Sequence, residues 1–257
     1  MKEVLDQAQV DIILPNYNSA LFVSETIDSV INQSFKNWNL IIVDGNSNED
    51  TKKVLKKYKD YSNISIIWLK KNKKAGFCRN LALRNSKSDY VAFIDSDDIW
   101  EKNKLQNQLS FMIKNQYSFT YTNYRTFTLT NEKKNLKEIK PPQYFTFKKF
   151  TKNTSISTCT MILKRSAIGN VKFSNTKICE DYFFKCQILK KGKNAYCLPK
   201  IMTKYRISNE SLQSNKFRNL FWIWIINKKY NKFGFFKNLI SLFSISINSI
   251  IKYGILR

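Results

Sequence analysis

Histidine is absent from the 257-residue sequence. Its absence excludes Ser-His-Asp and Cys-His nucleophilic catalysis, and it excludes zinc sites built on histidine. The five cysteines include no Cys-x-x-Cys pair, which indicates reduced, mostly buried thiols rather than a disulfide framework. The opening stretch, MKEVLDQAQV, lacks the apolar core of a signal peptide. We therefore expect a protein that works in the cytoplasm.

Acidic residues are scarce, with 19 Asp and Glu against 44 Lys and Arg, for a net charge of +25. This balance favours an anionic partner such as nucleic acid, a membrane surface or a phosphorylated substrate, although solvated surface lysines explain it equally well. No RNA-recognition motif, zinc finger or basic zipper is recognisable, so no nucleic-acid partner is expected. Neither a phosphate-binding loop nor a Gly-x-Gly-x-x-Gly motif is present, which disfavours phosphoryl transfer and dinucleotide binding.

What the sequence does contain is an alternation of short apolar runs and helical patterns. This alternation predicts right-handed crossovers and an α/β, Rossmann-like fold with a mostly parallel central sheet and helices on both faces. Such sheets bind ligands at the carboxyl ends of their strands. The predicted strands are 10–15, 39–44, 64–69 and 90–95, and the predicted helices are 23–31, 51–61, 76–85 and 101–113.

The pattern loosens beyond residue 115. We expect one domain over residues 1–212 and a basic helical tail over 213–257. Within the second half of the domain the patterns predict strands at 118–129 and in 157–168, a loop at 140–150, a helix at 180–192, and a strand pair at 194–198 and 202–206.

Three carboxylates directly follow the fourth predicted strand, in YVAFIDSDDIW (90–100). An oxygen-only cluster with an Asp-x-Asp core suits Mg²⁺ or Mn²⁺, which is commonly shared with substrate phosphates. Asp44 ends the second strand and is expected on the same rim. The alternative is that one acid caps the next helix and the others are solvated.

Five segments match, in order and spacing, those of family-2 glycosyltransferases with the GT-A fold: DIILPNYN, IIVDGNSNEDT, GFCRNLAL, VAFIDSDDIW and EDYFFKCQIL. The sequence resembles this family over about residues 10–210. The resemblance implies inverting transfer of a sugar from a nucleotide sugar, most often a UDP-sugar, to a glycan or lipid-linked saccharide. Many bacterial members build surface polysaccharide such as O-antigen, capsule or lipopolysaccharide. A catalytically inactive nucleotide-sugar-binding relative would show the same motifs.

The resemblance also implies a nucleotide site. Tyr17 would lie against the uracil ring and Asp44 would hydrogen-bond its edge. Where the family has two acids before Gly-Ser, this chain has DGNSNED, with one acid before Gly45. The implied nucleotide contacts are Pro15, Tyr17, Asp44, Arg79, Asp95 and Ser96.

Within the Asp-x-Asp motif, the resemblance implies that Asp97 is the principal metal ligand, with Asp95 toward the metal or the ribose. Asp98 and Arg79 would contact the donor sugar, or Asp98 would support the metal ligands. We expect Trp100 to serve in packing rather than in sugar stacking.

Inversion needs a base on the acceptor side, opposite the leaving diphosphate. The resemblance assigns this role to Asp181, next to Glu180. Independently, the spacing puts Asp181 on one helical face with Phe184 and Ile188, where burial would raise its pKa. Capping of the helix by Asp181 is the alternative. The family's segment after the base is matched by Tyr205, Arg206 and Ser211, and both a diphosphate contact and a structural salt bridge stay open for Arg206.

The tail has no acid after Glu210. Its uncharged run between Lys237 and Lys252 is short for a bilayer span. One helical stripe is polar and most of the remainder is apolar, which predicts an in-plane helix on an anionic leaflet, peripheral on the inner face of the plasma membrane. Packing on the domain and tail-mediated oligomers are the alternatives. The polar stripe is Lys237, Ser241, Ser244, Asn248 and Lys252.

Overall fold

The structure, a computed structural model, describes residues 2–128, 137–176, 178–207 and 216–253. One sheet runs through this part of the chain in the order β3-β2-β1-β4-β9-β6-β10-β5, with β7 beside β6 and β8 beside β10. Ser211 and the predicted boundary at 212 and 213 lie outside the described residues. The strands are β1 Val10–Asn16, β2 Trp38–Asp44, β3 Ile64–Trp68, β4 Tyr90–Phe93, β5 Ile99–Trp100, β6 Phe119–Phe127, β7 Glu138–Ile139, β8 Tyr144–Phe145, β9 Ile162–Lys164 and β10 Ala195–Arg206.

The first four strands form a parallel half-sheet, as predicted. The apolar runs of β1, β2 and β4 are buried on both faces because helices cover both sides, whereas the edge strand β3 is partly exposed. Parallel register aligns Asn16 with Asp44 at the carboxyl ends of β1 and β2. Strand β4 ends at Phe93, so the Asp95–Asp98 turn follows at the same edge.

The second half of the sheet adds antiparallel pairs: β9 runs against both β4 and β6. The strand pair predicted at 194–198 and 202–206 is wrong, because these residues form one strand, β10, parallel to β6. Pro199 and Lys200 are exposed and resemble a turn, but the strand continues past them through register shifts.

Two further segments differ from prediction. The loop expected at 140–150 contains strand β8 and the short helix α6, Phe147–Phe150. The strand expected in 157–168 is confined to β9, because a 3₁₀ turn at Thr158–Thr160 precedes it and helix α7, Arg165–Ile168, follows directly.

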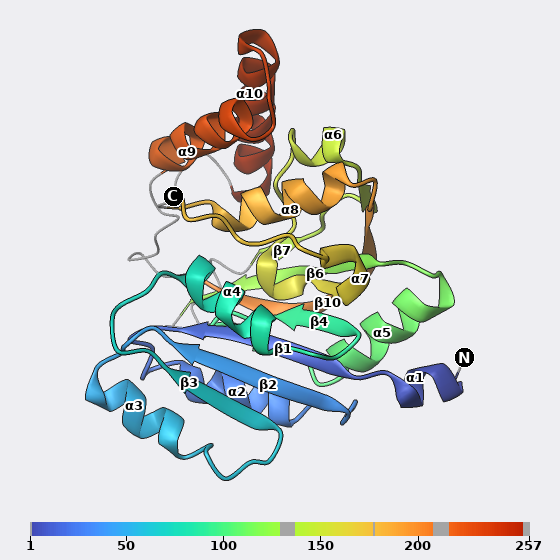
Figure 1. The fold of residues 1–257 in the computed structure, drawn as a ribbon. Helices are drawn as coiled ribbons and strands as arrows, with labels where there is room; N and C mark the ends of the chain where they lie inside the picture. Colours follow the sequence, from blue (N-terminus) through green and yellow to red (C-terminus); the bar gives the residue numbers. More distant parts are fainter. Residues whose placement is uncertain (1, 129–136, 177, 208–215, 254–257) are drawn as a thin grey trace.

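Alternate residues of the strands face two separate cores. Ile12, Leu40 and Ile42 pack under α1, α2, α3 and α5, whereas Ile13 and Ile41 pack under α4 and α8. Figure 1 shows α4 and α8 on one face, with α9 and α10 stacked beyond α8. The other helices are α1 Lys2–Gln7, α2 Val23–Ile31, α3 Glu49–Lys56, α4 Ala75–Asn85, α5 Lys104–Lys114, α8 Glu180–Lys190, α9 Lys216–Lys229 and α10 Phe235–Tyr253.

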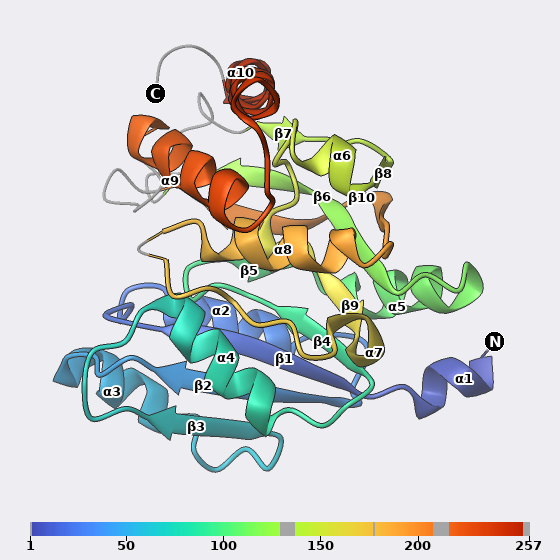
Figure 2. The ribbon, with the colours of Figure 1, turned by 45° about the horizontal axis from the view of Figure 1, so that its top comes forward.

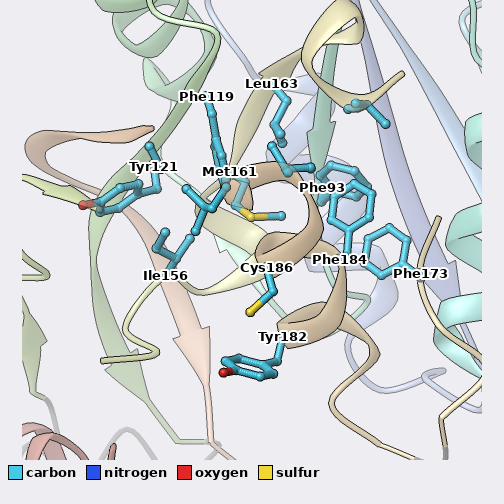
Figure 3. Packing of buried hydrophobic residues seen from close by; sticks show 14 of the residues in the cluster. Phe93, Phe119, Tyr121, Ile156, Met161, Leu163, Phe173, Tyr182, Phe184 and Cys186 are labelled. Carbon is cyan, nitrogen blue, oxygen red and sulfur yellow. The ribbon is translucent and has the colours of Figure 1, made fainter. Parts of the chain in front are cut away.

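Helix α8 is packed tightly into the core that it shares with α4 (Figure 3). The ring of Phe184 stacks on Phe173 with centroids 4.0 Å apart, and both rings meet Phe93 edge-on. Because Phe93 ends β4, this cluster fixes the start of α8 relative to the acidic turn that follows β4.

Candidate active site

The carboxyl ends of β1 and β2 are joined by a buried polar cluster. Asp44 is fully buried and accepts hydrogen bonds from the Asn16 amide (2.8 Å), the Ser47 backbone N–H (2.9 Å) and the Ser47 hydroxyl (2.6 Å). Both carboxylate oxygens therefore hold the turn that follows β2. Asp44 lies on the predicted rim, and in this arrangement it organises the loop.

Tyr17 follows β1 at this edge and is 48% exposed. A Cβ on Gly45 would lie 2.9 Å from the carbonyl oxygen of Lys73 and 3.6 Å from the Tyr17 ring, so glycine permits the loops after β2 and β3 to meet closely. Pro15 is buried inside β1. Ser96 is partly exposed in the turn after β4.

Arg79 connects two of the predicted acidic motifs. Its guanidinium is nearly buried and pairs with Asp95 (2.6 Å) on one side and with Glu180 (2.9 Å) on the other. Burial opposes the charge, but the two carboxylates raise the pKa of Arg79. The ring of Phe173 lies 5.3 Å below the guanidinium. Residues far apart in sequence thus meet at one point of the rim.

The acidic residues of the Asp-x-Asp-Asp turn lie in different environments. Burial and the neighbouring Asp95 raise the pKa of Asp97 to about 6. Asp98 is fully buried, and one of its oxygens accepts the backbone N–H of Arg206 (2.9 Å). This burial favours the supporting role of Asp98 over the donor-sugar contact. Trp100 is buried as expected, and its indole N–H donates to the Cys159 carbonyl.

Arg206 resolves one of the open alternatives in favour of a structural salt bridge. Its guanidinium pairs with Glu25 (2.6 Å) and lies between the rings of Phe22 and Phe127. It also donates to the main-chain carbonyl of Asp97 (2.9 Å). Strand β10 is thereby tied to the acidic turn.

Among the residues that the structure describes, no group of three or more His, Cys, Asp and Glu side chains is arranged to hold a metal ion. Two carboxylates completed by substrate phosphates are a common magnesium arrangement, and the residues present fit it. The Asp97 carboxylate offers oxygen ligands to a metal ion. Its pKa is raised because it is buried beside the Asp95 carboxylate. A cation here would relieve that repulsion.

Glu180 begins helix α8 at the wall of a cavity of about 350 Å³. Burial raises the pKa of Glu180, opposed by the charge of Arg79. Cys179, directly before it, has a left-handed backbone with φ of 60°, a conformation uncommon for residues other than glycine. The cavity is lined by Asn72, Lys73, Lys74, Gly76, Phe77, Ser174, Asn175, Thr176 and Glu180.

Asp181 corrects one prediction. Burial alone would raise its pKa, but the Lys185 ammonium, 2.8 Å from Oδ2, lowers the pKa of Asp181 to about 2. Thr158 donates to the same oxygen at 3.2 Å. Lys185 is buried and also donates to the Ile156 carbonyl. Asp181 does not cap α8, whose cap residue is Cys179 and whose start has no side-chain capping hydrogen bond.

The structure thus brings Asp95, Arg79 and Glu180 into direct contact, with Asp97 two residues after Asp95 and Asp181 directly after Glu180. Sequence reasoning missed Lys185 as the partner of Asp181, although the four-residue spacing of the two was a usable signal. Glu25, which holds Arg206, comes from α2 and gave no signal, because its partner lies 181 residues away.

Comparison with known proteins assigns the chain to a family. Residues 11–171 match the family described as Glycosyl transferase family 2, and the chain belongs to this family. It is 36% identical over 221 residues to the Escherichia coli protein WfgD, a UDP-Glc:alpha-D-GlcNAc-diphosphoundecaprenol beta-1,3-glucosyltransferase. That match covers 86% of this chain and 85% of WfgD.

The fold is the GT-A fold, as the resemblance implied. The chain superposes on the S. aureus TarS fragment 1–349 in complex with UDP-GlcNAc with a TM-score of 0.72 and 19% identity, covering 94% of this chain and 75% of that one. It superposes on the mannosyltransferase PcManGT from Pyrobaculum calidifontis, in complex with GDP-Man and Mn²⁺, with a TM-score of 0.69 and 15% identity, covering 93% and 70%. The chain is therefore a GT-A glycosyltransferase of family 2, similar to enzymes of bacterial saccharide synthesis.

Proposed function

We propose that this protein is an inverting glycosyltransferase that moves a sugar from a UDP-sugar to a lipid-linked saccharide in bacterial surface polysaccharide synthesis. The observation that carries the proposal is the Asp95–Arg79–Glu180 bridge, which joins the acidic turn after β4 to the acid pair that begins α8. The donor and the acceptor must meet at one edge of the sheet, and this bridge brings the two acidic segments together at that edge.

The donor would lie across the carboxyl ends of β1, β2 and β4. Tyr17 offers an exposed ring to a planar base, beside the close approach at Gly45. Asp44 and the main chain of Pro15 would form the base edge of the site, with Arg79 and Ser96 nearer the phosphates. The donors named for WfgD and for the TarS complex, UDP-Glc and UDP-GlcNAc, favour uridine.

Asp97, with Asp95, would hold Mn²⁺ or Mg²⁺ together with the donor diphosphate. Such a cation supplies charge neutralisation for the leaving diphosphate. The Mn²⁺ in the PcManGT complex supports this assignment. Asp95 already shares one oxygen with Arg79, so Asp97 is the principal ligand in this proposal.

Asp181 would act as the general base. The acceptor hydroxyl oxygen forms a bond to the anomeric carbon, the bond from that carbon to the diphosphate oxygen breaks, and its electron pair leaves with the nucleoside diphosphate. The hydroxyl proton passes to Asp181, and because Lys185 and Thr158 both reach Oδ2, Oδ1 is the oxygen assigned to receive it. Glu180 would fix Arg79 and border the acceptor.

The acceptor proposed is a lipid-linked saccharide, as named for WfgD, and the place of action is the cytoplasmic face of the plasma membrane. The five free cysteines suit a reducing compartment. No described helix is long and apolar enough to cross a bilayer.

Thermal-shift titration with UDP-sugars, with and without Mn²⁺, tests the donor site, because a ligand of the native state raises the melting temperature. We expect a Mn²⁺-dependent rise for one UDP-sugar. Asp97→Asn should abolish it, whereas Asp181→Asn should keep it and lose transfer by a factor of about 100 or more.

Full transfer by the Asp181→Asn variant would refute the base assignment. Donor binding by the wild-type chain without turnover on any acceptor would favour the inactive nucleotide-sugar-binding relative. Binding of a labelled oligonucleotide at physiological salt, without a donor response, would favour the nucleic-acid alternative.

A further inference from the structure

Helix α10 is attached to the domain through its polar side. Asn238 and Ser241 are nearly inaccessible to solvent, and Ser241 donates to the Thr151 carbonyl. One turn beyond Ser244, Asn248 donates to the Lys152 carbonyl at 3.1 Å. The middle of the polar stripe, which would face water on an isolated helix, therefore contacts the domain here through Ser241 and Asn248.

A buried polar network fixes α10 to α9 and both helices to α8. Asn227 accepts a hydrogen bond from the Tyr182 hydroxyl (2.8 Å) and donates to Asn238 (3.1 Å) and Ser241 (3.0 Å). Tyr182 directly follows Asp181 in α8. The α9–α10 hairpin is thus anchored to the helix that carries the proposed base (Figure 1).

The opposite side of α10 is apolar and open to solvent. Phe236, Phe243 and Ile251 are 78%, 70% and 77% exposed. Large side chains recur there at intervals of three and four residues, and this pattern forms a continuous helical stripe. The apolar face comprises Phe235, Phe236, Leu239, Ile240, Phe243, Ile247, Ile250 and Ile251 of α10.

The charge around this face has one sign. After Glu210 the sequence contains no Asp or Glu, while α9 ends in Lys228 and Lys229 and the turn to α10 contains Lys232. Lys237 follows Phe236 and is exposed. A partner that covers an apolar stripe on a segment whose only charged side chains are cationic is complementary when it combines hydrocarbon with negative charge, as an anionic leaflet does.

Helix α9 links the hairpin to the candidate active site. The thiol of Cys179 lies 3.8 Å from the carbonyl oxygen of Asn219, so the first turns of α9 lie against the start of α8. Helix α9 exposes two aromatic residues of its own here, Phe217 and Phe221, which flank Asn219 in sequence. Both views show α9 beside the beginning of α8 (Figure 2).

We infer that the apolar face docks in the plane of an anionic leaflet and thereby holds the Glu180–Asp181 end of α8 at the membrane surface, where a lipid-linked acceptor presents its diphosphate saccharide. The acceptor part of this inference rests on the proposed function, whereas the docking part does not. The hairpin supplies the rigid connection between the two.

Vesicle sedimentation tests the docking. The full chain should sediment with phosphatidylglycerol-containing vesicles and much less with phosphatidylcholine alone. Phe236→Ser/Phe243→Ser should lower the apparent partition coefficient at least about tenfold, because two large apolar side chains no longer enter the leaflet. Val4→Ser/Tyr61→Ser removes two exposed apolar side chains away from the hairpin and should leave binding unchanged.

Two acceptors then separate docking from catalysis. The Phe236→Ser/Phe243→Ser variant should transfer normally to a water-soluble, short-chain diphosphate saccharide and lose at least about tenfold on the long-chain form embedded in vesicles. Equal vesicle binding by this variant and the wild type, or no wild-type binding, would overturn the inference. A wild-type dimer in solution that this variant dissociates, without vesicle binding, would replace the leaflet by a second copy. Vesicle binding without transfer to either acceptor would contradict the proposed function alone.

Discussion

The Asp181 carboxylate and the Lys185 ammonium lie one helical turn apart on α8 and are in contact at 2.8 Å. Lys185 is almost completely buried, whereas Asp181 keeps a quarter of its side chain exposed. A cation held in that position keeps the carboxylate ionised. A carboxylate that is ionised in the resting enzyme throughout the physiological pH range is always ready to accept a proton. Its low pKa limits its strength as a base.

Replacing Lys185 by methionine should therefore shift the acid limb of the plot of kcat against pH to higher pH. Without the cation, burial dominates and raises the pKa of Asp181 above its ordinary value. With donor and Mn²⁺ saturating, so that Asp97 stays ionised in both proteins, the variant should lose kcat between about pH 4 and 6, where Asp181 of the wild type is still ionised. Steady-state rates from pH 4 to 8 measure this. Lys185→Arg keeps a cation and should keep the wild-type profile, and superimposable Met and wild-type profiles would contradict the role.

The same pair contributes to stability with a definite sign. The folded-state pKa of Asp181 is depressed, so its contribution is present above the unfolded pKa near 4 and is lost as the pH falls toward about 2. At neutral pH, Lys185→Met should cost about 3 kcal/mol of unfolding free energy, since it leaves a buried charge without its partner.

At the scale of elements, helices α4 and α8 begin against each other. A Cβ on Gly76 would lie 2.8 Å from Cγ of Glu180 and 3.2 Å from the Ser174 carbonyl oxygen. Glycine at this position lets the helix that carries Arg79 approach the helix that carries Glu180, so their ion pair forms.

Gly76→Ala should therefore displace Glu180 while leaving the fold intact. We expect kcat/KM to fall by about 10- to 100-fold, because a shift of about 1 Å at a positioning group has effects of that size. The melting temperature should fall modestly, because the added Cβ also presses on the Ser174 carbonyl oxygen and on the base of the Glu180 side chain. Gly234→Ala, where a Cβ would meet open space, is the matched control. Unchanged kinetics in Gly76→Ala would show that the contact is not needed.

The elements differ in how far the sequence determines them. Strands β1 to β4 and helices α4 and α8 were predictable because each carries a buried run or periodic face between clear breaks. Strand β10 was not, since Pro199 and Lys200 mimic a turn inside a strand that its neighbour β6 holds together. The two-residue strand β5 exists through pairing with Thr203 and Lys204 of β10 and carries no local signal.

The candidate active site also has a part that the sequence predicts and a part that depends on the fold. Asp95, Asp97, Glu180 and Asp181 were identifiable from motifs, but their environments depend on partners brought in by the fold. The Arg79 bridge and the burial of Asp98 are tertiary facts. The pKa of Asp181 was predicted in the wrong direction because the inward orientation of Lys185 depends on the Ile156 carbonyl, which lies on another segment.

At the scale of the whole molecule, the tail is part of the folded body. Ile223, Ile226 and Ile245 belong to the same core as α8, and Phe233 is buried between α9 and α10. Sequence patterns left packing on the domain and membrane contact as alternatives. The hairpin packs through one side and leaves the other side open.

Deleting residues 216–257 should therefore destabilise the protein rather than release an intact domain. Loss of the buried side chains Ile223 and Ile226 and of the Asn227 network should cost at least about 3 kcal/mol, equivalent to a fall of roughly 10 °C in melting temperature. Circular-dichroism melts measure this, with the Phe236→Ser/Phe243→Ser chain as the control that should melt like the wild type. Equal melting temperatures of the truncated and full chains would show an independent domain.

The inward polar side of α10 separates two kinds of evolutionary constraint. We expect selection for folding to act on Asn227, Asn238 and Ser241, and, under the proposed docking, selection for membrane binding to act on the outward apolar residues. The two sets share a helix but not a function. Substitutions confined to the outward residues of α10 could therefore change the binding partner from a lipid surface to another protein. The buried residues that hold the hairpin on the catalytic domain would stay the same.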